Sequence, residues 1–405
     1  MKVNRIQRIT ICRGHPFWEE CDKICLQAKN LYNYTNYIMR NEFVKHKIVP
    51  KYSDLAKMLK TEDVFKEIGS NSGQHVLKML CKNWKSFLVA VKDYSKNPSK
   101  YLGKPRIPKY LNKNGRYVCV LTNWQTQIKD GYLYFAFKRM KDFNNMFKVK
   151  FTGKHLSTRI VPKGNSYILE IVYEKEINEL QEVNNHIASI DLGVNNLITL
   201  TNNIGLKPII INGKKLKADN QYYNKTKAKY QSITKTTNKM DWSRRLQRIT
   251  DKRYWKMEYS LHKISKYIVD YCVEHNITNL VIGLNKTWKQ ECELYKDNLQ
   301  QNFIHIPYDN LIHKIQYKCE EHGIKVYITE ESYTSGTSFL DGEKPNKENY
   351  NKSRRVHRGL FVSNEGVKIN ADVNGSLQIM KKVFPNAFAN GIEGLDLTPS
   401  VINLL

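Results

Sequence analysis

The sequence lacks the cysteine spacing on which most zinc sites and redox motifs depend. It contains no Cys-x-x-Cys pair, and Cys21 and Cys25, which could share a helix face, have no second pair to complete a zinc site. We interpret the eight scattered cysteines as reduced structural thiols, with metal ligation or disulfides as the alternative. They are Cys12, Cys21, Cys25, Cys81, Cys119, Cys272, Cys292 and Cys319.

Long apolar runs are also missing from the sequence. No segment approaches the length of a membrane-spanning helix. The N-terminus alternates apolar and polar residues and has no continuous apolar core of a signal peptide. We therefore expect a cytoplasmic protein with no membrane partner.

Acidic residues are scarce relative to basic ones. The chain of 405 residues has 66 Lys and Arg against 38 Asp and Glu, a formal net charge of +28 and a pI near 9.6. Such an excess favours a polyanionic partner, and nucleic acid comes first. Hydrophobic residues make up 41% and aromatic residues 11%, which indicates a globular protein, and this length allows two or three domains.

Periodicity divides the chain into three regions. Residues 16–95 carry apolar side chains at helical spacing, and the Pro and Gly residues of 96–110 end the helices. Residues 116–176 change to the period of two of short strands, which predicts a small barrel or sandwich that the N-terminal strand could join. From Asn184 onward we expect three consecutive strands, a basic stretch, and then alternating helices and strands.

The third region has the element order of an RNase H-like domain, a fold that places catalytic carboxylates on strand ends and on a late helix. Asp191 ends an apolar strand, and Asp372 opens the last apolar helix. Clustered carboxylates supply the hard oxygen ligands for two metal ions, roughly 4 Å apart, that cleave a phosphodiester. Taken singly, Asp191 could be a turn residue beside a glycine, and Asp372 could be an N-terminal helix cap.

Seven short motifs follow one another along nearly the whole chain: KNLYNYTNYIMR, NPSKYLGKPRIPKY, LTNWQ, SIDLGVNNLITLT, ESYTSGTSFLD, RRVHRGLF and NADVNGSLQIMKK. Each motif is weak alone, but their order and spacing are specific. Together they resemble the TnpB (OrfB) proteins of bacterial insertion sequences, which are relatives of the type V CRISPR nucleases and of the eukaryotic Fanzors.

The resemblance implies a multidomain α+β protein. Its fold would be a wedge-like β-barrel with a helical recognition insertion, followed by an RNase H-like (RuvC) α/β nuclease domain. The barrel corresponds to residues 1–15 and 96–182, the helical insertion to 16–95, the nuclease domain to 183–331 and 366–405, and a target-nucleic-acid-binding insertion (a degenerate zinc finger) to 332–365.

The resemblance also implies an RNA-guided DNA endonuclease of a bacterial transposable element, which would be nucleoid-associated. Family members take a guide RNA from the element's end (the omega or right-end element RNA) and recognise a short motif beside a double-stranded DNA target. They cut with a RuvC site, here with Mg²⁺ as the expected metal. One alternative is a guided DNA-binding repressor whose nuclease site is inactive. Another is a strand-transfer transposase, against which the large RNA-binding front half argues.

The second acid of the site stands at an unusual place. In the commoner TnpB pattern it ends the strand after the bridging helix, where this chain has Gly283. Some relatives carry the glutamate one strand later, before a Thr-Ser pair, where this chain offers Glu330 and Glu331. We favour Glu331 because it stands three residues before Thr334. The alternative is that both are exposed strand-end acids and that nuclease activity is lost.

The thiolate pairs of the family's zinc finger are absent as well. Their positions hold Ser338, Asp341, Val362 and Glu365, and these side chains cannot supply thiolate ligation. We therefore expect no zinc. The insertion would be a metal-free loop, held by packing of Phe339, Leu360 and Phe361.

Basic residues of the third region resemble the family's bridging helix beside the guide–target duplex. A solvated charged face is the alternative, which the overall charge and the resemblance outweigh. The candidates on this helix are Arg245, Arg248, Lys252, Arg253 and Lys256. Arg354 and Arg355 are further nucleic-acid candidates in the insertion.

Two other short regions resemble those that touch the target-adjacent motif in relatives. Their candidate residues are Gln74, Lys78, Thr122 and Asn123. Such proteins recognise that short motif with side chains and leave the rest of the target sequence to base pairing.

Overall fold

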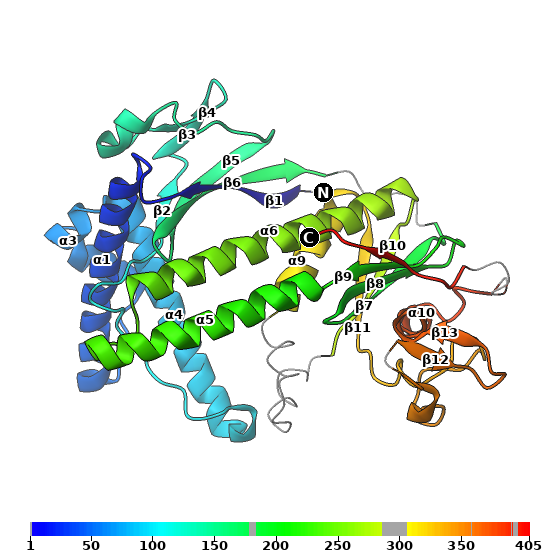
Figure 1. Ribbon diagram of the computed structural model, residues 1–405. Helices are drawn as coiled ribbons and strands as arrows, with labels where there is room; N and C mark the ends of the chain where they lie inside the picture. The colour runs from blue at the N-terminus through cyan, green and yellow to red at the C-terminus, as the bar shows by residue number, and fades with distance from the viewer. Residues whose placement is uncertain (1, 178–183, 286–305, 358, 390, 392–395) are drawn as a thin grey trace. The chain divides into compact units, whose positions relative to one another are not determined.

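A computed structural model describes residues 2–177, 184–285, 306–357, 359–389, 391 and 396–405 (Figure 1). The chain divides into two compact units, one of residues 2–176 and one that contains residues 177–405. Within the described residues, no helix is long and apolar enough to cross a membrane. The seven cysteines described are free, and Cys292 lies outside the described residues.

The first unit contains a four-stranded antiparallel sheet in the order β1-β6-β5-β2. Its strands are β1 (Lys2–Ile11), β2 (Cys119–Thr122), β5 (Lys154–Lys163) and β6 (Ser166–Glu176). The N-terminal strand joins the sheet as predicted, because Ile6 pairs with Val172 and Ile9 with Leu169. A separate hairpin consists of β3 (Thr126–Lys129) and β4 (Tyr132–Phe135). The pairings among the described strands leave this sheet open, so a closed barrel stays a prediction.

Helices occupy the chain between β1 and β2, as the apolar spacing predicts. They are α1 (Trp18–His46), α2 (Tyr52–Leu59), α3 (Asp63–Lys66), α4 (Ser70–Lys96) and the short 3-10 helix η1 (Pro98–Lys100). A further 3-10 helix, η2 (Lys138–Phe143), follows β4. Trp84 of α4 is fully buried and donates its indole N–H to Asn36 Oδ1 of α1 at 3.0 Å. A buried indole needs such a partner, so this bond fixes α4 against α1.

The second unit is built on a six-stranded sheet in the order β11-β10-β7-β8-β9-β14. Its strands are β7 (Ile187–Leu192), β8 (Asn196–Asn202), β9 (Ile209–Asn212), β10 (Asn279–Gly283), β11 (Lys325–Thr329) and β14 (Ser400–Ile402). The first three form the predicted antiparallel meander, and β10 and β11 add to β7 in parallel. The short strand β14, which pairs with β9, was not predicted.

Helices cover both faces of this sheet (Figure 1). α10 (Ala371–Val383) lies on one face, and α9 (Tyr308–Glu321) and the second half of α6 (Arg244–Glu274) lie on the other, whereas α5 (Lys214–Asn238) packs mainly along α6. Leu280 and Ile282 of β10 share a core with α6 and α9, whereas Val281 packs with Ile379 and Met380 of α10. Side chains alternate between the two faces of a strand. The polar residues at the strand ends therefore gather on the face of β10 and its neighbours that α10 covers.

The predicted loop-rich insertion lies between β11 and α10. It contains the 3-10 helix η4 (Lys352–Arg354) and the hairpin of β12 (Leu360–Val362) and β13 (Lys368–Asn370). Phe339 and Phe361 are buried in a small core with residues of α10, as predicted, whereas Leu360 is only half-buried.

Candidate active site

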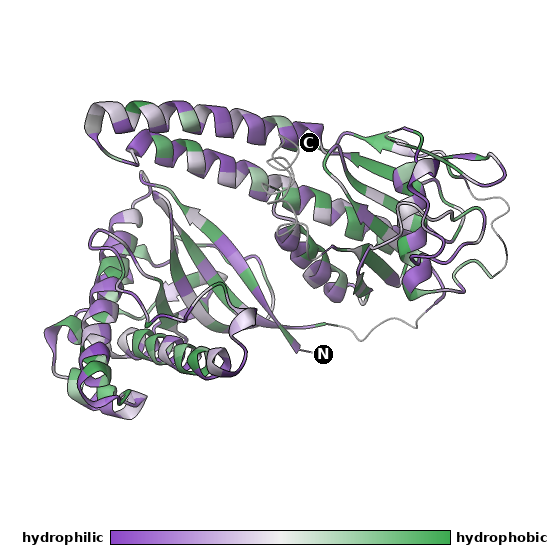
Figure 2. Ribbon diagram, turned by 90° about the horizontal axis from the view of Figure 1, so that it is seen from below, coloured by the Kyte–Doolittle hydropathy of each residue, from purple (hydrophilic) through white to green (hydrophobic). Residues whose placement is uncertain are grey.

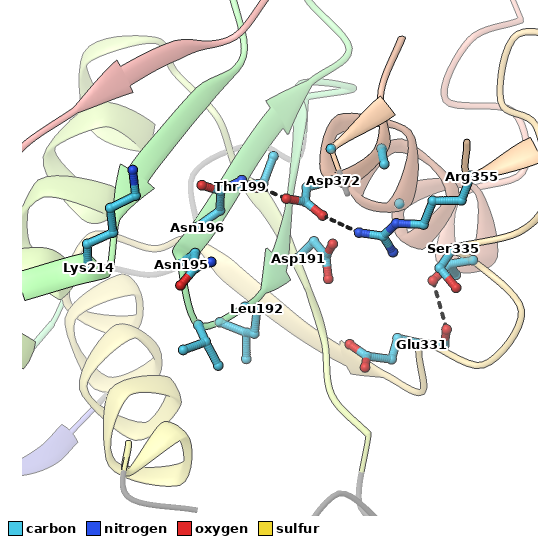
Figure 3. Close-up of a pocket in the computed structure, with 16 residues that line it drawn as sticks. Asp191, Leu192, Asn195, Asn196, Thr199, Lys214, Glu331, Ser335, Arg355 and Asp372 are labelled. Carbon is cyan, nitrogen blue, oxygen red and sulfur yellow. Dashed lines mark hydrogen bonds and ion pairs between the residues drawn. The ribbon is translucent and has the colours of Figure 1, made fainter. Parts of the chain in front are cut away.

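A cavity of about 470 Å³ opens at the carboxyl ends of β7 and β11, beside the start of α10. All three predicted acids line it: Asp191, Glu331 and Asp372. Figure 3 shows their carboxylates around one common space, with Arg355 reaching in from the insertion. The cavity is also lined by Leu192, Gly193, Val194, Asn195, Asn196, Thr199, Lys214, Thr334, Ser335, Gly359, Ala371 and Gly375.

Asp191 points into the cavity because side chains alternate between the two faces of β7. Ile190 and Leu192 join the core under α6 and α9, and Ser189 donates its hydroxyl to Ser376 O of α10 at 2.7 Å. Asp191 therefore points to the α10 side, as Ser189 does. A Cβ on Gly375 would lie 3.1 Å from Asp191 Oδ2, so this glycine allows α10 to pass close to the carboxylate.

Asp372 is positioned by a cap that the sequence did not reveal. The N-cap of α10 is Asn370, whose side chain accepts from the backbone N–H of Asp372 at 3.0 Å and of Val373 at 3.2 Å. The alternative that Asp372 itself caps the helix is therefore wrong. Its carboxylate instead accepts from Asn196 Nδ2 at 2.7 Å and from Arg355 Nη2 at 3.1 Å.

Glu331 and its neighbour Glu330 lie in different surroundings. Glu331 is half-buried and lines the cavity, whereas Glu330 is exposed and outside the lining. The Thr of the Thr-Ser pair closes a turn here, because Thr334 donates its hydroxyl to Glu331 O at 2.7 Å. A Cβ built on Gly283 would lie 3.5 Å from the Cβ of Glu331. The two alternative places for the second acid therefore adjoin one another.

The carboxylates of the cavity influence one another electrostatically. Burial, followed by the negative charges of Glu331 and Asp372, raises the pKa of Asp191 well above its usual value, and Arg355 opposes this shift. The pKa of Tyr308, whose hydroxyl donates to Gly193 O at 2.6 Å, is also raised by burial and by the charges of Glu331 and Asp191. The cavity therefore favours an added cation.

The donor set fits Mg²⁺ in chemistry, because carboxylate oxygens are the ligands that this hard ion prefers. No three His, Cys, Asp or Glu side chains among the described residues already stand in a metal-coordinating arrangement. Arg355 occupies one oxygen of Asp372, so ion binding requires a local rearrangement of these side chains.

The predicted basic candidates of α6 divide into two groups. Arg245, Arg248, Lys252 and Lys256 are exposed. The helix pair shows hydrophilic surface along α5 (Figure 2), whereas the second half of α6 carries buried apolar residues. Arg253 instead lies half-buried between the two helices, where its Nε donates to Asn220 Oδ1 at 2.8 Å. Its guanidinium also stands 4.9 Å from the centre of the Tyr223 ring, so it stabilises the helix pair.

The structure brings the two predicted motif-contacting segments together in the first unit. Gln125 is buried and bonded to Ser72 of α4 at 3.2 Å, and its Oε1 accepts from Thr122 N at 3.2 Å. This fixes the turn that carries Thr122 and Asn123 against the helix that carries Gln74 and Lys78.

Sequence reasoning missed two candidate residues. Trp124, at the tip of this turn, is 78% exposed, and an aromatic residue inside the polar run Thr-Asn-Trp-Gln was the available signal. Asn196, the partner of Asp372, lies in the Asn pair that follows Asp191 in the SIDLGVNN motif. The sequence offered no sign that it would reach a side chain so distant along the chain.

Arg354 and Arg355 have separate contacts despite their adjacency. Arg355 lines the cavity. Arg354 donates from Nη1 to both carboxylate oxygens of Glu343, at 2.8 and 2.7 Å, and its side chain is only 16% exposed. Arg354 is therefore held inside the insertion, and its predicted contact with nucleic acid stays untested.

Two family models match the sequence. The model OrfB_IS605, described as a probable transposase, matches residues 170–289, and the Cas12f1-like TNB domain model matches residues 308–379. A curated relative, the TnpB-like protein ORF457 of Acidianus two-tailed virus, is 26% identical over 242 residues, 58% of this chain and 48% of the relative. These sequence matches support a TnpB family protein, related to the type V effectors.

The chain spans about half the length of the curated relative that it matches. A solved Cas12f1–sgRNA–target DNA complex is 14% identical with a TM-score of 0.36, and covers 93% of this chain and 98% of that chain. A CRISPR-Cas12f ternary complex is 14% identical with a TM-score of 0.37, and covers 89% and 80%. The family assignment therefore rests on the sequence matches, and the account of the site on its own geometry.

Gly283 generates a testable prediction about the packing of β10. In Gly283→Ala the new Cβ would lie 2.4 Å from Ile379 Cδ1, and overpacking of this kind costs about 1–3 kcal/mol in the free energy of unfolding. Ile379→Val removes the offending methyl group, so the double variant should lose less stability than the two single losses added together. Urea unfolding of the four proteins measures this coupling.

The control for this cycle is Gly103→Ala, at a glycine with no atom within 4 Å of a built Cβ. It should leave stability nearly unchanged. Additive losses in the Gly283 and Ile379 cycle would contradict the close packing of β10 against α10.

Proposed function

We propose that this protein is an RNA-guided DNA endonuclease of a transposable element. The observation that carries the proposal is the convergence of Asp191, Glu331 and Asp372 on one cavity, from a central strand, the end of a neighbouring strand and the start of a helix. The strand order, a meander followed by two parallel strands, supports an RNase H-like (RuvC) domain. The matches to the OrfB_IS605 and Cas12f1-like TNB models and to a TnpB-like protein support the guided activity.

In this proposal Asp191, Glu331 and Asp372 would hold Mg²⁺. When bound, a pair of such ions supplies an acidified water as nucleophile and positive charge for the leaving oxygen. Asn196 orients Asp372 through its hydrogen bond. Arg355 pairs with Asp372, and its guanidinium would be placed to hold a phosphate oxygen of the DNA.

The nucleic-acid partners would be a guide RNA from the element's end and a double-stranded DNA target with an adjacent motif. The first unit supports this, because residues 2–176 contain 34 Lys and Arg against 14 Asp and Glu. The turn at Thr122 and Asn123, with Gln74 and Lys78 on α4, would contact the motif. Trp124 would stack on a base or sugar, since exposed aromatic side chains serve nucleic acids in this way.

A nuclease-inactive, guided DNA-binding repressor is the second candidate. Two observations favour it: the commoner position of the second acid is Gly283, and Arg355 pairs with Asp372 where a metal ion would bind. The candidates differ in one outcome, because only the endonuclease cuts its target when the cognate RNA and Mg²⁺ are present.

Substitution of the acids tests the endonuclease directly. Asp191→Ala, Asp372→Ala and Glu331→Gln should each slow cleavage by more than about 100-fold, since metal-bound charge is worth several kcal/mol of transition-state stabilisation. Guided DNA binding should remain. Glu330→Gln is the matched control, because its side chain is exposed and lies outside the cavity lining. If cleavage depends on Glu330 and not on Glu331, Glu330 is the second acid of the site.

The exposed basic residues of α6 generate a prediction about the salt dependence of nucleic-acid binding. These residues are Arg245, Arg248, Lys252 and Lys256. Arg248→Gln and Lys252→Gln should each lower the slope of log affinity against log salt by about 0.7–0.9, the share of one phosphate contact. Lys266→Gln is the control on the same helix, because Lys266 pairs with Asp270 at 2.7 Å near the other end. Filter-binding titrations across a range of salt concentrations measure the slopes. Equal slopes in all three variants would argue for a merely solvated face.

A further inference from the structure

The insertion between β11 and α10 is organised around one carboxylate, that of Glu343. Both of its oxygens accept from Arg354 Nη1, at 2.8 and 2.7 Å, and the two side chains are only 14% and 16% exposed. Glu343 Oε2 also accepts from the backbone N–H of Ser338 at 2.8 Å, and Oε1 from Asn364 Nδ2 at 3.3 Å. One side chain therefore joins three separate parts of the insertion.

These contacts link the two places where, by the resemblance to the TnpB proteins, a zinc finger would carry its thiolate pairs. Ser338 and Asp341 stand at the first place, and Asp341 N donates to Ser338 Oγ at 3.2 Å. Asp341 Oδ2 in turn accepts from the backbone N–H of Asn364, which lies within the second place, at 2.8 Å. Hydrogen bonds and an ion pair thus connect segments that a zinc ion would otherwise hold.

The carboxylate of Glu343 is already satisfied by these donors. Burial alone would raise its pKa, but hydrogen bonds from Arg354 and from the Ser338 amide hold the pKa below its usual value. A charged carboxylate with a buried arginine partner is costly to separate, because the remaining charge would then be unpaired. The pair is therefore suited to hold the insertion in one conformation.

The same network ties the insertion to the helix that carries Asp372. Lys381 Nζ donates to Gly342 O at 2.9 Å and to Glu343 O at 3.3 Å, and Gln378 Nε2 donates to Glu343 O at 3.3 Å. Asn374, fully buried on α10, donates to Thr337 O at 2.8 Å. The insertion is thereby bonded along one side of α10.

Arg354 is followed directly by Arg355, the arginine of the cavity. The segment that carries both begins with Asn351, whose side chain accepts from Ser353 N at 3.0 Å. Once Arg354 is bound to Glu343, the chain places Arg355 Nη2 at 3.1 Å from Asp372 Oδ1. The ion pair of Arg354 and the cavity contact of Arg355 are therefore adjacent in the chain.

We propose that the Glu343–Arg354 pair is a positioning device that replaces zinc in the insertion and places Arg355 in the nuclease cavity. This inference rests on the proposed function for its catalytic consequence, but not for its structural one. Glu343 and Arg354 touch neither the cavity nor its acids, so they act through Arg355.

Limited proteolysis tests the structural part without any cleavage of DNA. The wild-type insertion, residues 332–370, should resist protease in the presence of a zinc chelator, and the purified protein should contain no stoichiometric zinc. Glu343→Gln should make the insertion cleavable at unchanged protease concentration. Lys352→Gln, an exposed neighbour in the same segment, should leave it resistant. Protection lost on chelation, or retained in Glu343→Gln, would overturn the proposal.

DNA cleavage by the guided complex tests the positioning part. Arg354→Gln should lower the cleavage rate constant as far as Arg355→Gln does, and the double variant should be no slower than either, because both changes remove one arginine from the cavity. Arg354→Lys, which keeps the charge, should recover part of the rate. DNA binding should change by the same factor in Arg354→Gln as in Arg355→Gln, since both changes remove the same guanidinium from the cavity.

Additive losses in the Arg354 and Arg355 variants would overturn the positioning role. If the wild-type protein does not cut DNA but its insertion resists protease as described, the proposed nuclease function is wrong. The replacement of zinc by the ion pair would then still stand. The two failures are therefore distinguishable.

Discussion

Repulsion among three carboxylates that share one cavity is the constraint on which the second unit depends. Asp191, Glu331 and Asp372 come from separate elements, and the raised pKa of Asp191 reflects burial together with the other two charges. Without metal, Arg355 neutralises part of this negative charge, and the amide of Asn196 donates a hydrogen bond to Asp372. Such an arrangement costs stability unless it serves a cation or a substrate, and this cost is the physical argument for a functional site.

The surrounding structure serves to hold those charges together. The parallel strands β10 and β11 bring Glu331, just after the end of β11, to the same cavity as Asp191 of β7. Small residues allow α10 to approach. Gly375 passes close to Asp191, and Gly283 leaves room for Ile379 and Glu331. The absence of an acid at Gly283 is thus consistent with a site whose second carboxylate arrives from the next strand.

The sequence predicted much of this arrangement, and its failures have physical causes. The meander, the helical segment and the order of elements follow from periodicity, which local side chains determine. Which residue caps α10 did not follow, because Asn370 and Asp372 both suit a helix start. Glu330 and Glu331 were separable only once the end of β11 at Thr329 was known.

Tertiary contacts explain the remaining differences. Arg253 belongs to the same basic run as Arg248 and Lys252, yet it faces α5 and the ring of Tyr223. The Glu343–Arg354 pair joins residues of opposite charge in a loop-rich segment, where no periodicity predicts a partner. Closure of the first unit's sheet into a barrel likewise depends on contacts that strand patterns do not specify.

The central claim, that these acids bind divalent metal, is tested most directly by anomalous scattering from crystals grown with Mn²⁺, an ion that takes the same oxygen ligands as Mg²⁺. We predict anomalous peaks within the cavity, in contact with Asp191, Glu331 and Asp372, and a guanidinium of Arg355 that has left Asp372. A cavity without any peak, an ion bound by Glu330 instead, or an unchanged Arg355–Asp372 pair in the presence of Mn²⁺ would contradict the account.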